Sequence, residues 1–368
     1  MESSLIKFSD PLSEYLETKC EIDNAIAQVL NDGNYILGDQ VNRFEYEFSR
    51  YVSAKYCVGV GNGLDALTLS LQALNIGNGD EVIVPAHTFF ATWLAVLRLG
   101  AIPVGVEVEE LTYTLNPDLI ENKITKRTRA IIPVHLYGNP CHLDLIQKIA
   151  NKHGLFVIED AAQAHGTTYN DRKIGAHSHL IAWSFYPTKN LGCFGDGGAI
   201  TTNDKALADR IKSLRNYGSS EKYVHDHQGA NSRLDEIQAA ILNVKIKHLD
   251  RWNSMRKNVA NFYTSAINKN IVQLPHLSST NSQSWHLFVI RSNSRDRLKL
   301  HLDNFGIPTL IHYPIPPSRQ QAVRSLAINN SEFKLEDCIA NTVLSLPMHP
   351  FLTEDDLKRI ANAINSFH

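Results

Sequence analysis

The sequence predicts an α/β protein with a mixed, mostly parallel sheet in a large domain, followed by a smaller α+β C-terminal domain. Two observations support this prediction. Short runs rich in β-branched residues alternate with longer helical patterns through the first two thirds of the chain, which is typical of a parallel sheet covered by helices. After about residue 249 the alternation stops. The expected domains are residues 1–249, which hold the main site, and residues 250–368.

The first domain is expected to contain a strand at each short apolar run. Helical periodicity separates most of these runs, for example over 64–74 and 144–153. The expected strands are 56–60, 81–84, 102–106, 130–135, 155–159, 180–185 and 198–202.

The second domain is expected to hinge on one long helical pattern over residues 232–267. Beyond it, residues 284–291 read as a strand and residues 294–305 as an amphipathic helix. Residues 308–317 are rich in proline, and residues 353–366 read as a closing helix.

Composition excludes several classes of protein. The 368 residues are 43% hydrophobic and 20% charged, with a formal net charge of −2, so no basic stripe suggests a nucleic acid or a membrane surface. Apolar runs fall far short of the roughly 20 residues that cross a bilayer. The first residues show no signal pattern, which makes a cytoplasmic location the expectation. The five cysteines are widely spaced without a Cys-x-x-Cys pair, so neither a disulfide framework nor a metal site is expected.

A lysine and a carboxylate stand at the ends of two expected strands. Lys189 follows the 180–185 run in a polar turn, and Asp160 ends the 155–159 run. Ligands of open α/β sheets bind beyond the carboxyl ends of the strands, so both side chains are expected in one pocket. The pair suits pyridoxal 5′-phosphate (PLP), because a lysine amine forms a Schiff base with this cofactor and an acid keeps its ring nitrogen protonated.

Residues 56–67 read as a strand, a glycine turn and a helix start, which can bind an anion through free backbone N–H groups. A dinucleotide fingerprint would need glycine where Leu64 stands, and the Gly-Lys-Ser/Thr of a Walker loop is absent. A tight turn without a ligand remains the alternative for this segment by itself. Ser184 could add a hydroxyl donor to the same anion, although by itself it is more readily a strand-end serine.

Two segments offer groups that recognise a planar ring. Phe89 or Phe90 could supply an aromatic face, although each taken singly is better interpreted as a core residue. Gln163 could donate to a ring hydroxyl oxygen. A buried Asp160 requires a partner, because an unpaired carboxylate is costly to bury, and the PLP nitrogen would provide one. His165 is expected to pack or to form a hydrogen bond.

Together these segments resemble the DegT/DnrJ/EryC1/StrS family of PLP-dependent nucleotide-sugar aminotransferases. The resemblance covers essentially the whole chain, and its lysine and aspartate blocks in this order are highly specific. The segments that carry it are Asn34-Tyr-Ile-Leu-Gly38, Gly61-Asn-Gly-Leu-Asp-Ala-Leu67, Glu159-Asp-Ala-Ala-Gln-Ala164, Ser184-Phe-Tyr-Pro-Thr-Lys-Asn-Leu-Gly192, Gly195-Asp-Gly-Gly198, Asn216-Tyr-Gly218, Asn231-Ser-Arg-Leu-Asp-Glu236 and Leu346-Pro-Met-His349.

The resemblance implies an aspartate-aminotransferase-like fold (PLP fold type I) and a homodimer with shared active sites. It implies that Lys189 carries the cofactor and that Asp160 pairs with its ring nitrogen. Phe89 would stack on one side of the ring, and Gln163 would contact it from the other. Some members have histidine in place of the lysine and carry out dehydration, so Lys189 favours transamination.

The same resemblance distributes the phosphate contacts over two subunits. Gly63, Leu64 and Ser184 would bind the phosphate from one subunit, and Asn231 would reach the phosphate of the neighbouring subunit. Residues 217–229 would form a loop at that interface.

A narrower resemblance involves residues 216–223, 231–236 and 309–317. They are similar to the subgroup that aminates carbon 3 of dTDP-linked 3-keto-6-deoxyhexoses, in which case Tyr217, His312 and Tyr313 would contact the sugar nucleotide. The amino donor would be L-glutamate, and the product, a dTDP-3-amino-3,6-dideoxyhexose, would serve glycan biosynthesis of the O-antigen or S-layer type. A 4-keto-sugar transaminase, a PLP lyase and a non-catalytic sugar sensor are the alternatives.

Overall fold

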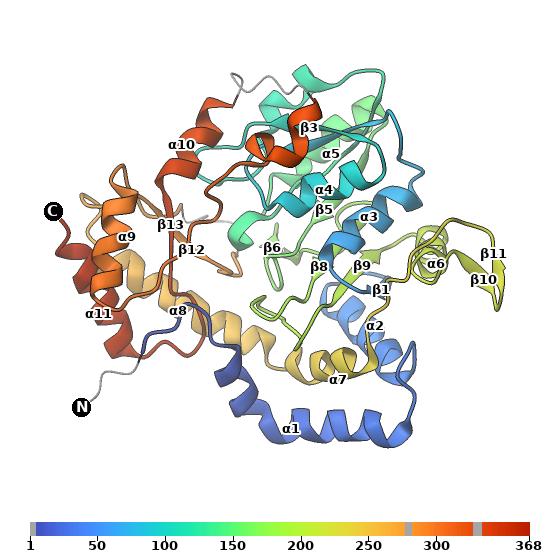
Figure 1. Cartoon of the computed structure of the whole chain (residues 1–368), viewed down its shortest axis with the longest axis horizontal. Helices are drawn as coiled ribbons and strands as arrows, with labels where there is room; N and C mark the ends of the chain where they lie inside the picture. The colour runs from blue at the N-terminus through green and yellow to red at the C-terminus, as the bar shows by residue number, and fades with distance from the viewer. Residues whose placement is uncertain (1–4, 277–281, 327–332) are drawn as a thin grey trace.

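A seven-stranded mixed sheet forms the centre of the larger part of the molecule (Figure 1). The structure is a computed structural model that describes residues 5–276, 282–326 and 333–368. The strand order is β1-β9-β8-β5-β4-β2-β3, and only β9 runs in the opposite direction to the other six strands. The predicted mostly parallel sheet is therefore confirmed. Its strands are β1 (Tyr56–Val60), β2 (Glu81–Pro85), β3 (Ile102–Val106), β4 (Thr128–Ile131), β5 (Phe156–Asp160), β8 (Leu180–Ser184) and β9 (Gly198–Thr202).

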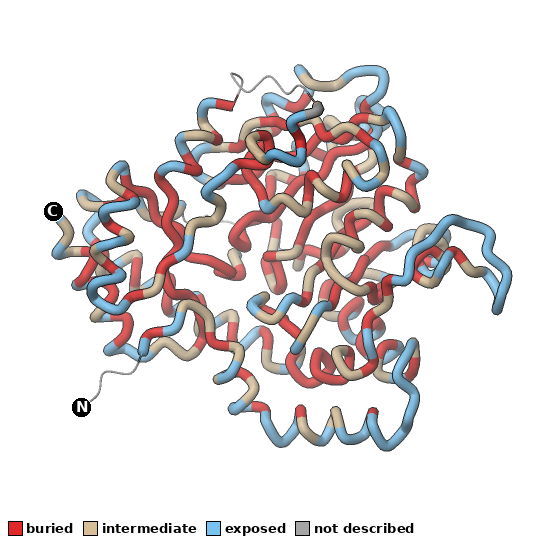
Figure 2. Tube along the Cα trace, viewed as in Figure 1, coloured by how far each residue is buried: buried red, intermediate tan, exposed pale blue. Residues whose placement is uncertain are grey.

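Helices cover both faces of this sheet, which explains why its strands are apolar throughout rather than alternating. On one face α3 (Gly63–Ala73), α4 (Phe90–Arg98) and α6 (Lys205–Leu214) pack against inward residues such as Val82. On the other face α2 (Asp39–Tyr51) and α5 (Leu143–His153) pack against residues such as Ile83. Figure 2 shows the strands buried and the outer surfaces of the helices exposed.

A second, smaller group of helices and strands packs around the antiparallel pair β12 (Phe288–Arg291) and β13 (Val343–Leu346). The helices α8 (Leu249–Ala266), α9 (Arg295–Asn304) and α11 (Glu354–Asn365) contribute apolar residues to its core. Ile6 also packs there, so the N-terminal segment belongs in space with the C-terminal part of the chain. The domain division at residues 249 and 250 stays a prediction.

The single helical pattern predicted over residues 232–267 is wrong. Two helices occupy the segment, α7 (Glu236–Lys245) and α8, and residues 246–248 connect them through tightened i to i+3 bonds. The helix breaks because α7 buries its apolar face against the sheet, whereas α8 buries its face in the smaller core.

Two predicted strands differ from their expected bounds by more than one residue. β4 ends at Ile131 rather than residue 135, since Pro133 has no N–H to continue the ladder, and only an isolated bridge joins Val134 to Asp160. β12 begins at Phe288 rather than residue 284.

The remaining elements lie at the periphery. The long N-terminal helix α1 (Pro11–Asp32) lies along α7, and the hairpin β10–β11 projects from the body with its residues exposed (Figures 1 and 2). No helix in the described ranges is both long and apolar enough to cross a membrane. The other elements are β6 (Thr168–Tyr169), β7 (Arg172–Lys173), β10 (Ser219–Glu221), β11 (Val224–His225), α10 (Lys334–Thr342) and the 3₁₀ turns Pro117–Leu119, Glu121–Lys123, Leu136–Gly138, Pro317–Arg319 and Gln321–Leu326.

A buried carboxylate joins two distant segments of the chain. Helix α2 begins after Gly38, which has no side chain to cap the helix. Glu236 supplies the cap from α7: one carboxylate oxygen accepts from the N–H groups of Gly38 (2.7 Å) and Val41 (3.0 Å), and the other from that of Gln40 (2.9 Å). These bonds satisfy donors that would otherwise be orphaned at the helix start.

We expect Glu236→Gln to lower the free energy of unfolding by about 1–3 kcal/mol, because an amide replaces one acceptor oxygen with a donor that faces an N–H group. Urea denaturation at a fixed protein concentration measures the change. The matched control Glu47→Gln, on the exposed side of α2, should stay within about 0.5 kcal/mol of the parent. Equal stability of the two variants would contradict the capping role.

Candidate active site

A cavity of 570 Å³ lies where the carboxyl ends of the central strands meet the starts of α3 and α4. Such a position is the usual ligand site of α/β sheets. Its lining includes most of the residues predicted from the sequence. They are Gly63, Leu64, Phe89, Asp160, Gln163, Ser184, Lys189, His312 and Tyr313.

One corner of the cavity presents free backbone donors. Helix α3 starts at Gly63, and the Asn62 side chain caps it by accepting from Asp65 N–H at 2.8 Å. The N–H groups of Gly63 and Leu64 have no acceptor among the described residues. A Cβ on Gly63 would lie 2.7 Å from Cβ of Ser184, so only glycine lets the helix start approach this strand end. The corner suits a phosphate group.

Asp160 ends β5 and has no cationic hydrogen-bond partner among the described residues. Its carboxylate accepts from the Thr92 hydroxyl (2.9 Å) and from Ala162 N–H (3.2 Å). Burial raises the pKa of Asp160 above its ordinary value, although these hydrogen bonds and the nearby charge of Lys189 oppose the shift. A protonated pyridine nitrogen would satisfy this carboxylate, so the residue fits PLP. The sequence did not reveal the contribution of Thr92.

Gln163 is held in a fixed orientation. Its side-chain oxygen accepts from Tyr137 N–H at 2.6 Å, and its side-chain nitrogen donates to the Tyr313 hydroxyl at 3.1 Å. The amide keeps one N–H free for the ring hydroxyl oxygen that the sequence argument assigned to it.

The two phenylalanines of the 85–92 segment differ in their surroundings. Phe89 stands at the N-cap of α4 with 56% of its surface exposed, and its ring lies 5.4 Å from that of Tyr313. Phe90 also lines the cavity but packs against the core on the α3 and α4 side of the sheet. Phe89 is therefore the freer of the two to stack on a planar ligand.

Lys189 lies in the loop after β8. The backbone N–H of Lys189 donates to the carbonyl of Tyr186 at 2.8 Å and closes a turn in this loop. Its Nζ atom has no hydrogen bond or ion pair among the described residues. Burial lowers the pKa of Lys189 from 10.5 to about 8, against the opposing attraction of Asp160. At this pKa about a tenth of the amine is neutral at pH 7, far more than for an ordinary lysine, and the neutral amine is the form that a nucleophile or a proton acceptor requires.

Two buried histidines, His165 and His286, and the partly buried His312 lie near this lysine, and burial holds each of them neutral. It lowers the pKa of His165 to about 3, that of His312 to about 4, and that of His286 well below the ordinary value. His165 lies between Trp183 and Phe185, and among the described residues neither of its ring nitrogens has a hydrogen-bond partner, so of the two roles expected for it the structure favours packing. The sequence did not single out His286.

Tyr217 and Asn231 lie outside the cavity of their own subunit. Both flank the projecting hairpin, where Tyr217 N–H bonds to Ala230 O and Asn231 bridges to Asn216. Both are exposed. Neither residue lines the cavity at Lys189.

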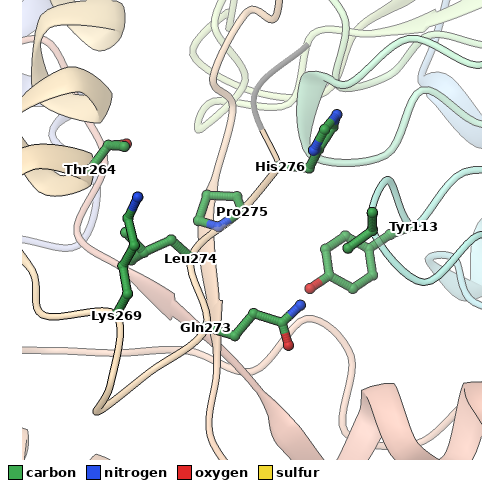
Figure 3. Close-up of a pocket in the computed structure, with 8 residues that line it drawn as sticks. Tyr113, Thr264, Lys269, Gln273, Leu274, Pro275 and His276 are labelled. Carbon is green, nitrogen blue, oxygen red and sulfur yellow. The ribbon is translucent and has the colours of Figure 1, made fainter.

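A second cavity, of 420 Å³, lies beside Tyr113 (Figure 3). Lys269, Gln273 and His276 line it together with apolar residues, and the lining contains no carboxylate. The cavity holds none of the residues predicted from the sequence, so the chemistry is assigned to the cavity at Lys189.

Comparison with known proteins gives a consistent identification. The DegT/DnrJ/EryC1/StrS aminotransferase family is matched over residues 17–365. The erythromycin biosynthesis sensory transduction protein EryC1 of Saccharopolyspora erythraea is 49% identical, over 95% of this chain and 96% of its own. A dTDP-3-amino-3,4,6-trideoxy-α-D-glucose transaminase of Streptomyces venezuelae is 47% identical, over 100% and 97%. A dTDP-3-amino-3,6-dideoxy-α-D-galactopyranose transaminase of Aneurinibacillus thermoaerophilus is 46% identical, over 99% of each chain.

Solved structures agree with these relatives. DesV of S. venezuelae superposes with a TM-score of 0.96 at 48% identity, covering 98% of both chains. NtdA of Bacillus subtilis, with bound cofactor PMP, has a TM-score of 0.91 at 32% identity, covering 99% of this chain and 85% of its own. The predicted aspartate-aminotransferase-like fold is confirmed.

The depressed pKa of Lys189 predicts how cofactor capture depends on pH. Because only the neutral amine reacts, the rate at which the apoenzyme captures added PLP should rise with pH and level off above about 8. Stopped-flow visible absorbance follows the capture. A rate that keeps rising towards pH 10.5, the ordinary lysine value, would show that burial does not act on this amine.

Proposed function

The chain belongs to the DegT/DnrJ/EryC1/StrS aminotransferase family, and we propose that it transfers the amino group of L-glutamate to a dTDP-linked 3-keto-6-deoxyhexose. The product is a dTDP-3-amino-3,6-dideoxyhexose. The observation that carries the proposal is the cavity in which Lys189 and Asp160 stand beside the donor-lined start of α3. Relatives that cover almost the whole chain are named for amino groups on carbon 3, which supports the same position here.

Pyridoxal 5′-phosphate is the cofactor, and when bound it supplies an electron sink that stabilises negative charge next to the transferred nitrogen. We assign its phosphate to Gly63, Leu64 and Ser184, whose donors converge on one corner. Asp160 would hold the ring nitrogen. Phe89 would stack on the ring and Gln163 would donate to its hydroxyl oxygen.

Lys189 would act twice in each half of the reaction. Its amine would hold the cofactor and, when neutral and released, would take the proton from the α-carbon of the amino acid and return it on the cofactor side. Its low pKa suits both tasks, because about half of the amine is neutral near pH 8 and the other half carries a proton. Asp160 keeps the ring nitrogen protonated throughout.

The sugar nucleotide would enter against His312 and Tyr313, which line the cavity near Phe89. The exposed positions of Tyr217 and Asn231 support a homodimer in which each hairpin reaches the neighbouring site. We further propose a cytoplasmic enzyme without nucleic acid or membrane partners, whose product enters a lipopolysaccharide or S-layer glycan.

The alternatives are weaker. A 4-keto-sugar transaminase would use the same cofactor residues, but the names of the relatives above favour carbon 3. A sensor that only binds sugar has no need for Lys189, Asp160 and Gln163 to remain together in one cavity. EryC1, whose name describes sensory transduction, matches 95% of this chain, and the named transaminases match 99–100% at similar identity, so the EryC1 match does not by itself favour a sensor.

The substrate assignment predicts a specific amino sugar nucleotide as the product, whose mass can be measured. With L-glutamate as donor, the enzyme should convert a dTDP-3-keto-6-deoxyhexose faster than its 4-keto isomer, and mass spectrometry should detect the amino sugar nucleotide. Lys189→Ala should abolish turnover while still binding PLP non-covalently. Faster conversion of the 4-keto isomer, or normal turnover by the variant, would overturn the assignment.

Shared sites predict complementation between two inactive variants. Co-expressed Lys189→Ala and Asn231→Ala subunits should recover about a quarter of wild-type activity at limiting PLP, because half of the dimers are mixed and each mixed dimer contains one intact site. Each variant alone should be nearly inactive under these conditions. No recovery in mixed dimers isolated with two affinity tags would place Asn231 in its own subunit's site.

A further inference from the structure

Asn190, the residue after Lys189, joins three separate parts of the chain through its side chain. Its amide nitrogen donates to Asn253 Oδ1 on α8 (2.9 Å) and to the backbone carbonyl of Ser284 (2.7 Å). Its amide oxygen faces Nδ1 of His286 at 3.1 Å. All of these groups except Asn253 are buried.

A relay of hydrogen bonds runs from the backbone carbonyl of His165 through the side chains of Asn253 and Asn190 to His286. Backbone carbonyls can only accept hydrogen bonds, and they fix the direction of every bond in this relay. Asn253 donates its own nitrogen to the carbonyl of His165 at 2.8 Å, so its oxygen is left to accept from Asn190. The carbonyl of Ser284 likewise requires the nitrogen of Asn190. The Asn190 oxygen is therefore the atom that faces His286, and Nδ1 of His286 must carry the proton.

The other ring nitrogen of His286 is then an acceptor. His286 lines the cavity with Lys189, and its Nε2 atom has no hydrogen-bond partner among the described residues. Unlike both nitrogens of His165, Nε2 is not sealed from solvent. Burial keeps the ring neutral, so its lone pair stays available. His312, the other histidine in the lining, bonds through Nδ1 to a serine hydroxyl, which can donate or accept and so fixes no tautomer.

We propose that Nε2 of His286 accepts a hydrogen bond from a ring hydroxyl of the sugar substrate and so helps to distinguish the two substrates that use this cavity in turn. The inference rests on the proposed function. L-glutamate, once joined through its nitrogen, offers two carboxylates, which only accept hydrogen bonds. A hexose offers hydroxyl groups that donate. An acceptor of fixed tautomer thus suits the sugar and gives glutamate no bond.

His286→Asn separates this role from a structural one. The asparagine nitrogen can replace Nδ1 as the donor to Asn190, but the shorter side chain has no atom at the Nε2 position. We expect the KM for the 3-keto sugar nucleotide to rise about tenfold, the value of one neutral hydrogen bond, and the KM for L-glutamate to change much less. His276→Asn, at an exposed histidine beside the other cavity, is the matched control and should match wild type in both.

The outcomes distinguish the inference from the proposed function. Unchanged sugar KM in His286→Asn, or an equal loss for both substrates, overturns the role of His286 in sugar binding. A wild-type enzyme that accepts no 3-keto sugar nucleotide overturns the proposed function instead. In that event ¹⁵N NMR of histidine-labelled protein still tests the relay. The signals of His286 are those present in the wild type and missing in His286→Asn, and they should show a ring protonated at Nδ1. A ring protonated at Nε2 overturns the relay.

Discussion

The loop that carries Lys189 is held by buried polar groups on both sides, and the site depends on this restraint. On one side the ammonium of Lys245, fully buried on α7, donates to Gly192 O at 2.6 Å and lies 2.7 Å from a carboxylate oxygen of Glu14 on α1. On the other side Asn190 joins the loop to α8. Burying a charge is costly unless it is paired, so Lys245 stabilises this arrangement only while Glu14 and the Gly192 carbonyl are in place.

The restraint matters because the reacting groups come from distant parts of the sequence. The phosphate corner belongs to the turn after β1, Phe89 to the turn after β2 and Asp160 to the end of β5. Parallel strands bring these ends to one edge of the sheet. The close approach of Gly63 to Ser184 completes that edge, because any side chain at Gly63 would push the anion corner away from the lysine loop. Burial at the same edge lowers the pKa of Lys189, so packing and reactivity have a common cause.

Sequence reasoning located the elements whose signal is local. β1, β3 and β9 have the predicted bounds, and Lys189, Asp160 and Gly63 meet in one cavity as the strand-end argument required. Reasoning failed where the outcome depended on distant partners. The break between α7 and α8 depends on which core each helix faces, and helical periodicity does not encode this. Thr92 forms a hydrogen bond with Asp160, and His286 forms one with Asn190. Both pairs are far apart in the sequence, so no local sequence pattern predicts these bonds. Tyr217 and Asn231 lie outside the cavity lining, and their proposed contact with a ligand would need a second subunit, which one chain's sequence pattern does not place.

The visible absorption spectrum of the purified protein, recorded before and after the addition of L-glutamate, tests most directly whether this cavity is the site of an amino-transfer reaction. The account predicts a visible band from cofactor bound to Lys189, which glutamate shifts into the near ultraviolet as the amino group moves onto the cofactor. A protein that shows no band after incubation with PLP, or a band that no amino donor changes, would contradict the account.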